Sequence, residues 1–424
     1  MKARLRELVF QGLSYLARHK LHKVKPKIVG ITGSAGKTCA KDAIAAVLQR
    51  HFKVKKSQKN INSEFGAAFT ILDQNSSINS WVKWPKVIFK SIKNAFTNLN
   101  PYEVLVMEMG IDAPGGMEDI LKVVKPEIMV FLNVKNVHRG EGQFANREEI
   151  FHEKSKALIA APKEGWAILN TDDNFVKGLV DKLPCSVLTI GTEEGADLRA
   201  IDIKADSRGL QFTLAYEDKE IPVHLPDLLG ACHVYMVLVA TAVGFLNGMS
   251  WKAIEMELKE FTLPAGRMNK IDGKNGALII DSSYNASPDT MEEALEVLSM
   301  FSGRRIAALG TMNELGELAE SSHLKIGKLA ARKADLLVAV GQHAKSLAEG
   351  AHRAGMSTSM IHTFASSKEA GGFLKGILEA HDVLMVKGSQ NNVRMERIVR
   401  TCMKEPEQAR HLLVRQEPYW LNIL

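Results

Sequence analysis

A lysine followed by a threonine closes a glycine-rich segment, TGSAGKT, which covers Thr32 to Thr38. The segment lies between an apolar run at residues 28–31 and a helical pattern at residues 40–48. In a strand, turn and helix of this kind, backbone N–H groups face a phosphate, the lysine reaches the terminal phosphates and the hydroxyl ligates Mg²⁺. We therefore predict a nucleoside triphosphate site, which consists of Gly33, Ser34, Ala35, Gly36, Lys37 and Thr38. The spacing is a shortened variant of the general phosphate-loop pattern, and a turn without a ligand is the alternative.

Two further polar residues stand where predicted strands end. Glu108 closes the run VLVMEM at residues 104–109, and His138 follows the run IMVFLNV at residues 128–134. Open parallel sheets bind ligands at the carboxyl ends of their strands, so Glu108 can complete a Mg²⁺ shell begun by Thr38. His138 can be a second metal ligand or an acid/base. The alternatives are a helix cap or surface acid at Glu108 and an ordinary loop histidine at His138.

The elements that must position these residues alternate along the chain. Continuous apolar runs, such as WAILN at residues 166–170, are separated by helical patterns, which predicts a parallel sheet covered on both faces. Residues 197–224 differ, because Leu210, Phe212 and Leu214 stand at alternate positions and predict an antiparallel excursion. A helical segment follows at residues 233–245.

A proline and a glycine in LPAGR, residues 263–267, predict a hinge before a second alternating series. Its predicted strands lie at residues 277–283, 305–310, 336–341 and 383–388, with helices between them. We therefore predict an α/β protein of three parts. These are a basic helix at residues 1–27, a central phosphate-loop domain with a mostly parallel sheet at residues 28–262, and a Rossmann-like α/β domain at residues 263–424.

The composition of the 424 residues, 46% hydrophobic and 24% charged, is typical of globular proteins and excludes a disordered or fibrous chain. The four cysteines lie far apart without CxxC spacing, so we predict neither disulfides nor a zinc site and expect a reducing cytoplasm. We find no apolar run long enough to span a bilayer and no signal-peptide pattern.

The net charge of +7 is confined to one segment. Residues 1–27 hold eight Lys and Arg and one acid, and the rest of the chain is balanced. The apolar residues of this segment recur at helical spacing, as in a peripheral membrane-surface helix. They are Leu5, Leu8, Val9, Leu13 and Leu16. The alternative is a helix packed on its own domain. We expect no nucleic acid partner, because no basic and aromatic pattern continues beyond this segment.

Ten motifs, taken together in their order, resemble those of the Mur ligases over residues 28–400. They are TGSAGKT, NINSEFG from Asn60, EMGIDAPGGM from Glu108, NVKNVH from Asn133, EKSKA from Glu153, LNTDD from Leu169, AGR from Ala265, DSSYNASP from Asp281, LGTMNELG from Leu309 and KGS from Lys387. The resemblance implies an ATP-dependent amide ligase of peptidoglycan precursor synthesis, and we expect this ligase to be a monomer. Its substrates would be a muramoyl peptide and D-alanyl-D-alanine, which are joined through an acyl phosphate.

The resemblance also implies roles for single residues. Thr38 and Glu108 would hold one Mg²⁺, while His138 and a carbamylated Lys154 would hold a second. From the residues alone, Lys154 is an ordinary helix-surface lysine. Catalysis would involve Lys37, His138, Lys154 and Arg267, the nucleotide would contact Asp281 and Asn285, and the substrates would face Asn62, Glu314, Lys387 and Ser389.

The sequence departs from the family pattern at several places. Only 27 residues precede the first predicted strand, where the family usually has a domain that binds uridine diphosphate. His233, Met236, Thr311 and Lys156 also stand where the family has other residues. We therefore keep three alternatives: a ligase for a non-UDP or lipid-linked acceptor, a folate polyglutamylation enzyme, and a non-catalytic membrane-associated scaffold.

Overall fold

The computed structural model describes residues 2–57, 65–74, 84–97, 101–135 and 142–421. Two of the predicted site residues, Asn62 and His138, lie outside these ranges. The chain forms two units. The first comprises Met1–Ile201, Thr213–Val223 and Val234–Phe261, and the second comprises Asp202–Phe212, His224–His233 and Thr262–Leu424.

The larger sheet has nine strands among the described residues, in the order β2-β3-β1-β4-β5-β6-β7-β8-β9. From β2 to β7 every neighbouring pair runs parallel. The strands are β1 (Lys27–Thr32), β2 (Val54–Lys56), β3 (Val104–Glu108), β4 (Ile128–Phe131), β5 (Trp166–Asn170), β6 (Ser186–Gly191), β7 (Leu198–Asp206), β8 (Gly209–Tyr216) and β9 (Lys219–Leu225). The predicted parallel sheet is confirmed.

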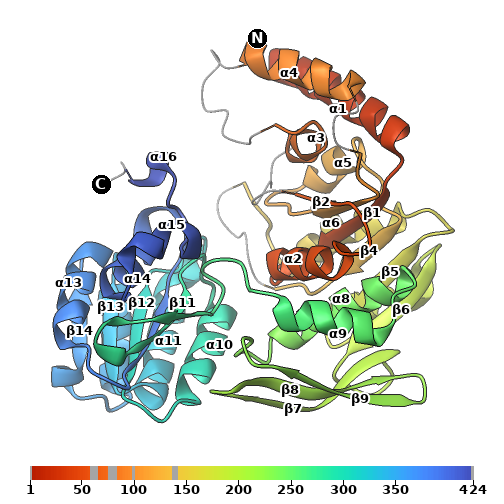
Figure 1. Ribbon diagram of the computed structural model, residues 1–424. Coiled ribbons are helices and arrows are strands. Elements are labelled where there is room, and N and C mark those ends of the chain that lie inside the picture. Colours follow the sequence, from red (N-terminus) through yellow and green to blue (C-terminus); the bar gives the residue numbers. More distant parts are fainter. Residues whose placement is uncertain (1, 58–64, 75–83, 98–100, 136–141, 422–424) are drawn as a thin grey trace. The chain divides into compact units, whose positions relative to one another are not determined.

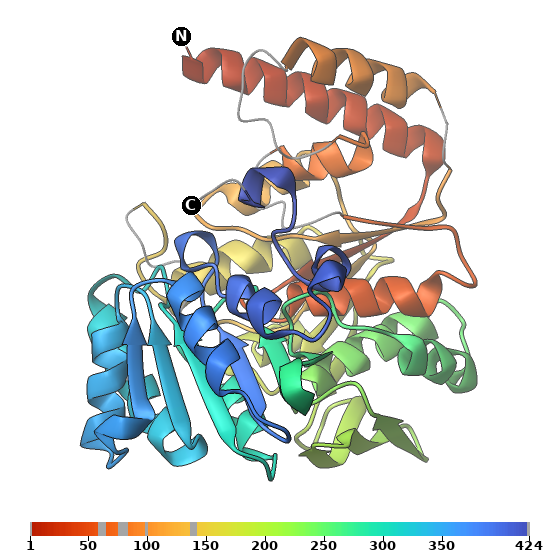
Figure 2. The same ribbon diagram turned by 60° about the vertical axis from the view of Figure 1, so that its left-hand side comes forward.

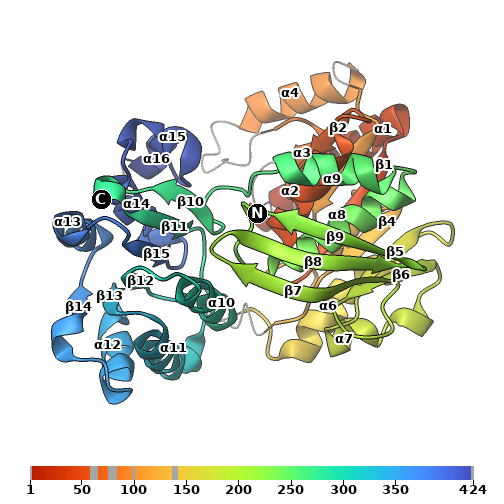
Figure 3. The same cartoon turned by 60° about the horizontal axis from the view of Figure 1, so that its bottom comes forward.

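The last three strands form the antiparallel part that the alternation of apolar residues predicts. Two residues separate β7 from β8, and two separate β8 from β9, which is a connection that only antiparallel neighbours can make. Figure 3 shows these three strands side by side. Leu210, Phe212 and Leu214 are buried. The outermost strand, β9, contains an exposed proline, Pro222.

Helices cover both faces of the parallel strands. They are α1 (Lys2–Val24), α2 (Lys37–Leu48), α3 (Gly66–Ile71), α4 (Trp84–Phe96), α5 (Gly116–Leu121), α6 (Arg147–Ile159), α7 (Asn174–Lys177), α8 (His233–Leu246) and α9 (Trp251–Glu260). On one face, side chains of β3 and β4 such as Met107 and Phe131 share a core with α3, α5 and α6. On the other face, α2 packs against β1, β3 and α9. The strands are therefore buried on both sides, as their continuous apolar sequences require.

The N-terminal helix α1 packs on its own unit. Phe10, Leu13 and Ala17 are buried in the same core as α3, and Figures 1 and 2 both show α1 beside α4. One face of this basic helix therefore packs on its own unit, as the alternative in the sequence analysis expects. Leu5 and Leu8 remain 50% and 64% exposed. Within the described residues, no helix is long and apolar enough to cross a membrane.

The second sheet has six strands in the described part of the chain, in the order β10-β11-β15-β12-β13-β14. All neighbours are parallel except β10 and β11. The strands are β10 (Asn269–Asp272), β11 (Leu278–Ser282), β12 (Arg305–Gly310), β13 (Leu336–Val340), β14 (Ile361–Phe364) and β15 (Val383–Lys387). The four predicted strands form its centre, and β10 and β14 are additions at the edges.

Alternate residues of these strands enter two separate cores. Ala307, Leu309 and Met385 pack with α10, α11 and α12, whereas Ile306, Ala308 and Leu384 pack with α13 and α14. The helices are α10 (Pro288–Ser299), α11 (Ala319–Lys333), α12 (Ala344–Arg353), α13 (Ser367–Ile377), α14 (Glu396–Cys402), α15 (Ala409–Leu412) and α16 (Pro418–Leu421). Figure 2 shows this sheet between its helices.

Candidate functional site

The predicted phosphate loop lies between β1, which ends at Thr32, and α2, which begins at Lys37. Gly33 has φ +146° and Gly36 has φ +82°, a backbone region that favours glycine. Gly36 is the N-cap of α2, and no side chain of the described residues caps the helix there. The first turn of α2 contains no acidic residue. The positive end of α2 is therefore suited to an anion.

Asn133, which lies two residues after the end of β4, holds this loop in place. Its Oδ1 accepts hydrogen bonds from the backbone N–H groups of Ser34 and Ala35, at 3.2 and 2.9 Å. Its Nδ2 donates to the carbonyl of Ala35 at 3.2 Å. The hydroxyl of Ser34 in turn accepts a bond from the N–H of Lys135 at 3.0 Å. The sequence analysis missed this role, although the position of Asn133 at a strand end was a usable signal.

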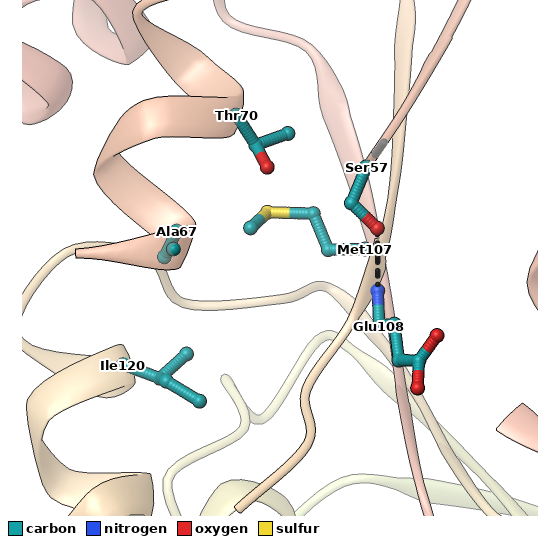
Figure 4. A pocket seen from close by; sticks show the side chains of 7 residues that line it. Ser57, Ala67, Thr70, Met107, Glu108 and Ile120 are labelled. Atoms are coloured by element: carbon teal, nitrogen blue, oxygen red, sulfur yellow. Dashed lines mark hydrogen bonds between the residues drawn. The ribbon is translucent and has the colours of Figure 1, made fainter. Parts of the chain in front are cut away.

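The two residues predicted to hold one Mg²⁺ are in contact. Oγ1 of Thr38 donates to Oε2 of Glu108 over 2.9 Å, and Glu108 is 7% exposed. The register of β1 and β3 places Ile31 beside Glu108, so the two strands end together. The N–H of Glu108 donates to Oγ of Ser57 at 3.1 Å. In Figure 4 this bond is drawn, and Met107 points toward Thr70 while the carboxylate of Glu108 points away.

Lys37 folds back over the loop. Its Nζ donates to the carbonyl of Gly33 at 2.8 Å and lies 3.5 Å from the carbonyl of Ser34. The ammonium group therefore stands at the N-terminus of α2, where a terminal phosphate is expected. A lysine in this position lowers the energy of negative charge on a transferring phosphoryl group.

Lys154 is fully buried in the middle of α6. This helix begins at Asn146, whose side chain accepts a bond from the N–H of Glu149 at 2.9 Å. Among the described residues, Nζ of Lys154 has no hydrogen-bond partner. Burial, and then the charge of Lys37, hold the pKa of Lys154 well below its ordinary value, although Asp112, Glu108 and Glu153 oppose this shift. Burial therefore favours the neutral form of the amine, which is the nucleophilic form.

The metal-binding capacity of this region can be judged from its donors. Within the described ranges, no group of three or more His, Cys, Asp or Glu side chains is arranged to hold a metal ion. The Thr38 hydroxyl and the Glu108 carboxylate are hard oxygen donors, which is the chemistry of a Mg²⁺ site that also uses phosphate oxygens and water. They fit one such ion. Of the predicted second pair, Lys154 is buried in this unit and His138 lies outside the described residues.

In the second unit, Asp281 is buried on β11. Its Oδ1 accepts a bond from the N–H of Ser283 at 3.0 Å, and its Oδ2 has no partner among the described residues. Burial raises the pKa of Asp281 to about 6, while the hydrogen bonds of Ser283 lower it.

Hydrogen bonds connect Lys387 and Ser389 to the loop that carries Asn285. Nζ of Lys387 donates to the carbonyl of Asn285 at 3.0 Å and to Oγ of Ser282 at 3.1 Å. Oγ of Ser389 donates to the carbonyl of Ala286 at 3.1 Å. Oδ1 of Asn285 accepts a bond from the N–H of Gln390 at 3.2 Å. Both side chains thus contact the loop that carries Asn285, and Oγ of Ser389 also accepts a bond from the N–H of Asn313 at 2.9 Å. Burial lowers the pKa of Lys387 to about 8, and the charge of Arg267 adds to this effect.

Arg267 and Glu314 complete the predicted set. The guanidinium of Arg267 stacks over the ring of Tyr284, 4.0 Å from its centroid. Glu314 is exposed and has φ +62° in the turn before α11.

Arg415 is a further residue that the sequence analysis missed. It is 9% exposed, and its guanidinium donates to the carbonyls of Ser283 and Tyr284 and to Oε2 of Glu396. Glu396 also pairs with the buried Arg394. Arg415 thereby connects the C-terminal part of the chain, including Glu396, to the loop before Asn285. No spacing signal along the sequence marks this contact.

The residues that depart from the family pattern have structural partners. His233 is buried, which lowers its pKa to about 4, and Met236 is buried as well. Oγ1 of Thr311 accepts a bond from the N–H of His343 at 3.3 Å. Lys156 pairs with Glu118 and Glu153.

Known proteins share both parts of this chain. The Mur ligase middle domain matches residues 31–244, and the Mur ligase, glutamate ligase domain matches residues 266–390. A UDP-N-acetylmuramoyl-tripeptide–D-alanyl-D-alanine ligase of Bacillus subtilis is 25% identical over 93% of this chain and 80% of its own length. The protein of the same name from Mycobacterium tuberculosis is 30% identical over 85% of this chain and 70% of its own length.

Solved structures of two MurF ligases are also similar to this chain. MurF ligase from Thermotoga maritima in complex with ADP has a TM-score of 0.77 and 25% identity, and covers 94% of this chain and 84% of that one. MurF from Acinetobacter baumannii has a TM-score of 0.75 and 26% identity, and covers 91% of this chain and 79% of that one. The α/β architecture of both sheets is shared with these proteins.

Proposed function

The chain belongs to the Mur ligase family, and we propose that it joins D-alanyl-D-alanine to a UDP-N-acetylmuramoyl tripeptide with consumption of ATP. Members of this family are ATP-dependent ligases of peptidoglycan synthesis. The substrates proposed here are those that the names of the Bacillus and Mycobacterium relatives give. We keep the three proposed parts of the chain, which are residues 1–27, 28–262 and 263–424.

The observation that carries the proposal is the contact of Thr38 with Glu108 at the N-terminus of α2. A hydroxyl and a carboxylate meet there, and Lys37 precedes the threonine in the chain, so that together they supply the donor set for a magnesium-bound triphosphate. This arrangement supports phosphoryl transfer, in which positioning and charge stabilisation supply most of the catalysis.

In the proposed reaction, the terminal carboxylate of the tripeptide attacks the γ-phosphorus of ATP, and ADP leaves. The amine of D-alanyl-D-alanine then attacks the acyl carbon, loses a proton, and displaces phosphate. Lys37 would bind the terminal phosphates, and the backbone of Gly33 to Gly36 would bind those next to them. Thr38 and Glu108 would hold Mg²⁺, which when bound neutralises charge on the phosphoryl oxygens.

We propose a carbamate on Lys154. Burial favours the neutral form of the amine, and this form attacks CO₂ and then loses a proton from its nitrogen. The product is an anion with two oxygens, and it would join His138 as a ligand of a second Mg²⁺. The absence of a described partner for Nζ supports this assignment. It can be tested with ¹³C-labelled bicarbonate, which should give a carbamate carbon signal in the wild type and none in Lys154→Arg.

In the second unit we propose that Asp281 and Asn285 bind the nucleotide and that Arg267 reaches the phosphates. Lys387 and Ser389 support the loop of Asn285 through the bonds described above, and we keep them, with Glu314 and Asn62, as substrate-facing residues. The proposal also includes a monomer in the cytoplasm and a peripheral membrane contact that involves residues 1–27.

The decisive experiment measures phosphate release from ATP with each substrate omitted in turn. Release should require both a UDP-linked muramoyl tripeptide and D-alanyl-D-alanine, and Lys37→Ala should abolish it. Lys177→Ala, which removes an exposed lysine on α7, is the matched control and should retain activity. If phosphate is released only with a lipid-linked acceptor, that acceptor takes the place of the UDP-linked tripeptide in the proposal. ATP binding that is equal in the wild type and Lys37→Ala, without turnover, would indicate a scaffold instead.

A further inference from the structure

Helix α4 presents a row of apolar side chains to solvent. Phe89, Ile92 and Phe96 are 71%, 44% and 52% exposed. Their spacing of three and four residues places them on one face of the helix. The opposite face is anchored in the protein, because Ser91 and Ala95 are buried. Scattered exposed apolar residues are ordinary in proteins, but a contiguous row marks an interaction surface.

A second row on α1 adjoins the first. Leu5, Leu8 and Tyr15 are 50%, 64% and 61% exposed, and they follow one stripe of the helix that continues to His19. The ring of His19 lies 4.7 Å from that of Phe96 and 6.5 Å from that of Tyr15, between centroids. The two helices lie side by side (Figures 1 and 2), so the rows meet at this point. We call these residues, with the lysines named next, the α1–α4 surface.

Basic residues predominate among the charges around the rows, and Glu7 is the one acidic residue of α1. Lys86, Lys90 and Lys93 are exposed on α4, which contains no acidic residue. None of the three forms an ion pair with a carboxylate of the described residues. On α1, Nζ of Lys23 lies 5.4 Å from the centroid of the Phe96 ring. Apolar side chains bordered by lysines are the pattern of helices that lie in the interface of an anionic bilayer.

We propose that the α1–α4 surface docks on an anionic lipid bilayer, with Phe89, Ile92 and Phe96 among the acyl chains and the lysines on the headgroups. This deepens the membrane contact proposed for residues 1–27 by assigning α4 to it, and it does not depend on the ligase reaction. A second copy of the chain is a poor occupant, because a two-fold contact would bring lysine against lysine. No helix of the described chain spans a bilayer, so the contact is peripheral.

The test is flotation of the full chain with vesicles of phosphatidylcholine and phosphatidylglycerol in equal amounts, and with phosphatidylcholine alone. Deletion of α1 is unsuitable, because Phe10, Leu13 and Ala17 belong to the core. The test variants are therefore Phe89→Ser with Ile92→Ser, and Lys90→Glu with Lys93→Glu. Met256→Ser with Lys252→Glu makes the same kinds of change on the exposed side of α9 and is the control.

We expect the wild type and the control to bind the anionic vesicles, and salt to weaken this binding. Each test pair should weaken binding about tenfold or more, with unchanged thermal unfolding and unchanged ligase activity without lipid. Failure of the wild type to bind, or equal binding by the test pairs, would overturn the proposal. So would binding of a labelled nucleic acid in preference to vesicles, or a dimer in sedimentation that the test pairs disperse. Ligase activity is read separately, so failure here leaves the proposed reaction standing.

Discussion

The hydroxyl of Thr38 donates a hydrogen bond to the carboxylate of Glu108 over 2.9 Å, although 70 positions separate the two residues. The contact follows from the sheet. β1 and β3 are parallel neighbours, and Ile31 lies opposite Glu108. Helix α2, which follows β1, therefore begins beside the end of β3. The geometry of one strand pair therefore fixes a pair of oxygen donors at the positive end of a helix.

Thr38→Val should lower kcat/KM for ATP about 100-fold, because the oxygen donor at the proposed metal site is lost. The protein should lose only about 1 kcal/mol of stability, since one partly buried hydrogen bond is removed. Steady-state phosphate release at several Mg²⁺ concentrations tests this. Thr38→Ser keeps the hydroxyl and should restore most of the activity. If Val and Ser variants are equally active, the hydroxyl has no role in catalysis.

Lys154 should make stability increase with pH in buffer free of CO₂. Its pKa is lowered in the folded protein, whereas in the unfolded chain it titrates near its ordinary value of 10.5. The unfolded chain therefore binds more protons between these two values, and the free energy of unfolding rises with pH across that window. Lys154→Met should be more stable than the wild type at about pH 7.5 and should lose this slope. The measurement is thermal unfolding of the wild type and of Lys154→Met at a series of pH values. If stability depends on pH in the same way in both proteins, the buried amine is charged.

Asp281 should make stability decrease as pH rises, which is opposite to the effect of Lys154. Its pKa is about 6 in the folded protein against an ordinary 3.8. The folded chain binds more protons between these values, so the free energy of unfolding falls as pH rises through that window. Asp281→Asn should gain about 3 kcal/mol at pH values above about 7 and lose activity if the carboxylate contacts nucleotide. The exposed Asp272 on β10 provides the control, Asp272→Asn. Denaturant unfolding at pH values on both sides of the window measures the difference.

Arg415→Met should destabilise the second unit by about 3 kcal/mol, because it leaves the buried Glu396 with one cation fewer and two carbonyls without a donor. The loop before Asn285 would lose its fastening, so KM for ATP should rise more than kcat falls. Arg410→Met removes an exposed arginine from α15 and should change neither quantity. A fall in stability with unchanged KM would separate Arg415 from nucleotide binding.

Much of the fold could be predicted because its strands are buried on both faces. The run at residues 104–109 predicted β3, and alternation of Leu210, Phe212 and Leu214 predicted the antiparallel part. β14 (Ile361–Phe364) was missed, since it is short and only partly buried at the sheet edge, where no continuous apolar run is needed. The short β10 at the opposite edge was missed as well.

The site could be predicted as far as strand ends determine it. Thr38 and Glu108 were expected to be neighbours because one follows a central strand and the other ends one, and their contact is observed. The bracing of the loop by Asn133 and the bonds of Lys387 to the Asn285 loop depend on how loops fold back. Periodicity carries no information on such contacts. The metal, nucleotide and substrate roles remain predictions.

The proline of β9 has a consequence for association between molecules. β9 is the outermost described strand of the nine-stranded sheet, and a strand in that position offers its free N–H and C=O groups to any extended segment that approaches. Pro222 has no N–H to offer, and Lys219 and Glu220 expose charges on the same strand. A strand that paired with β9 would lack one backbone hydrogen bond at Pro222, and it would have to remove water from the charges of Lys219 and Glu220. This margin of the sheet therefore resists serving as a template for fibre growth.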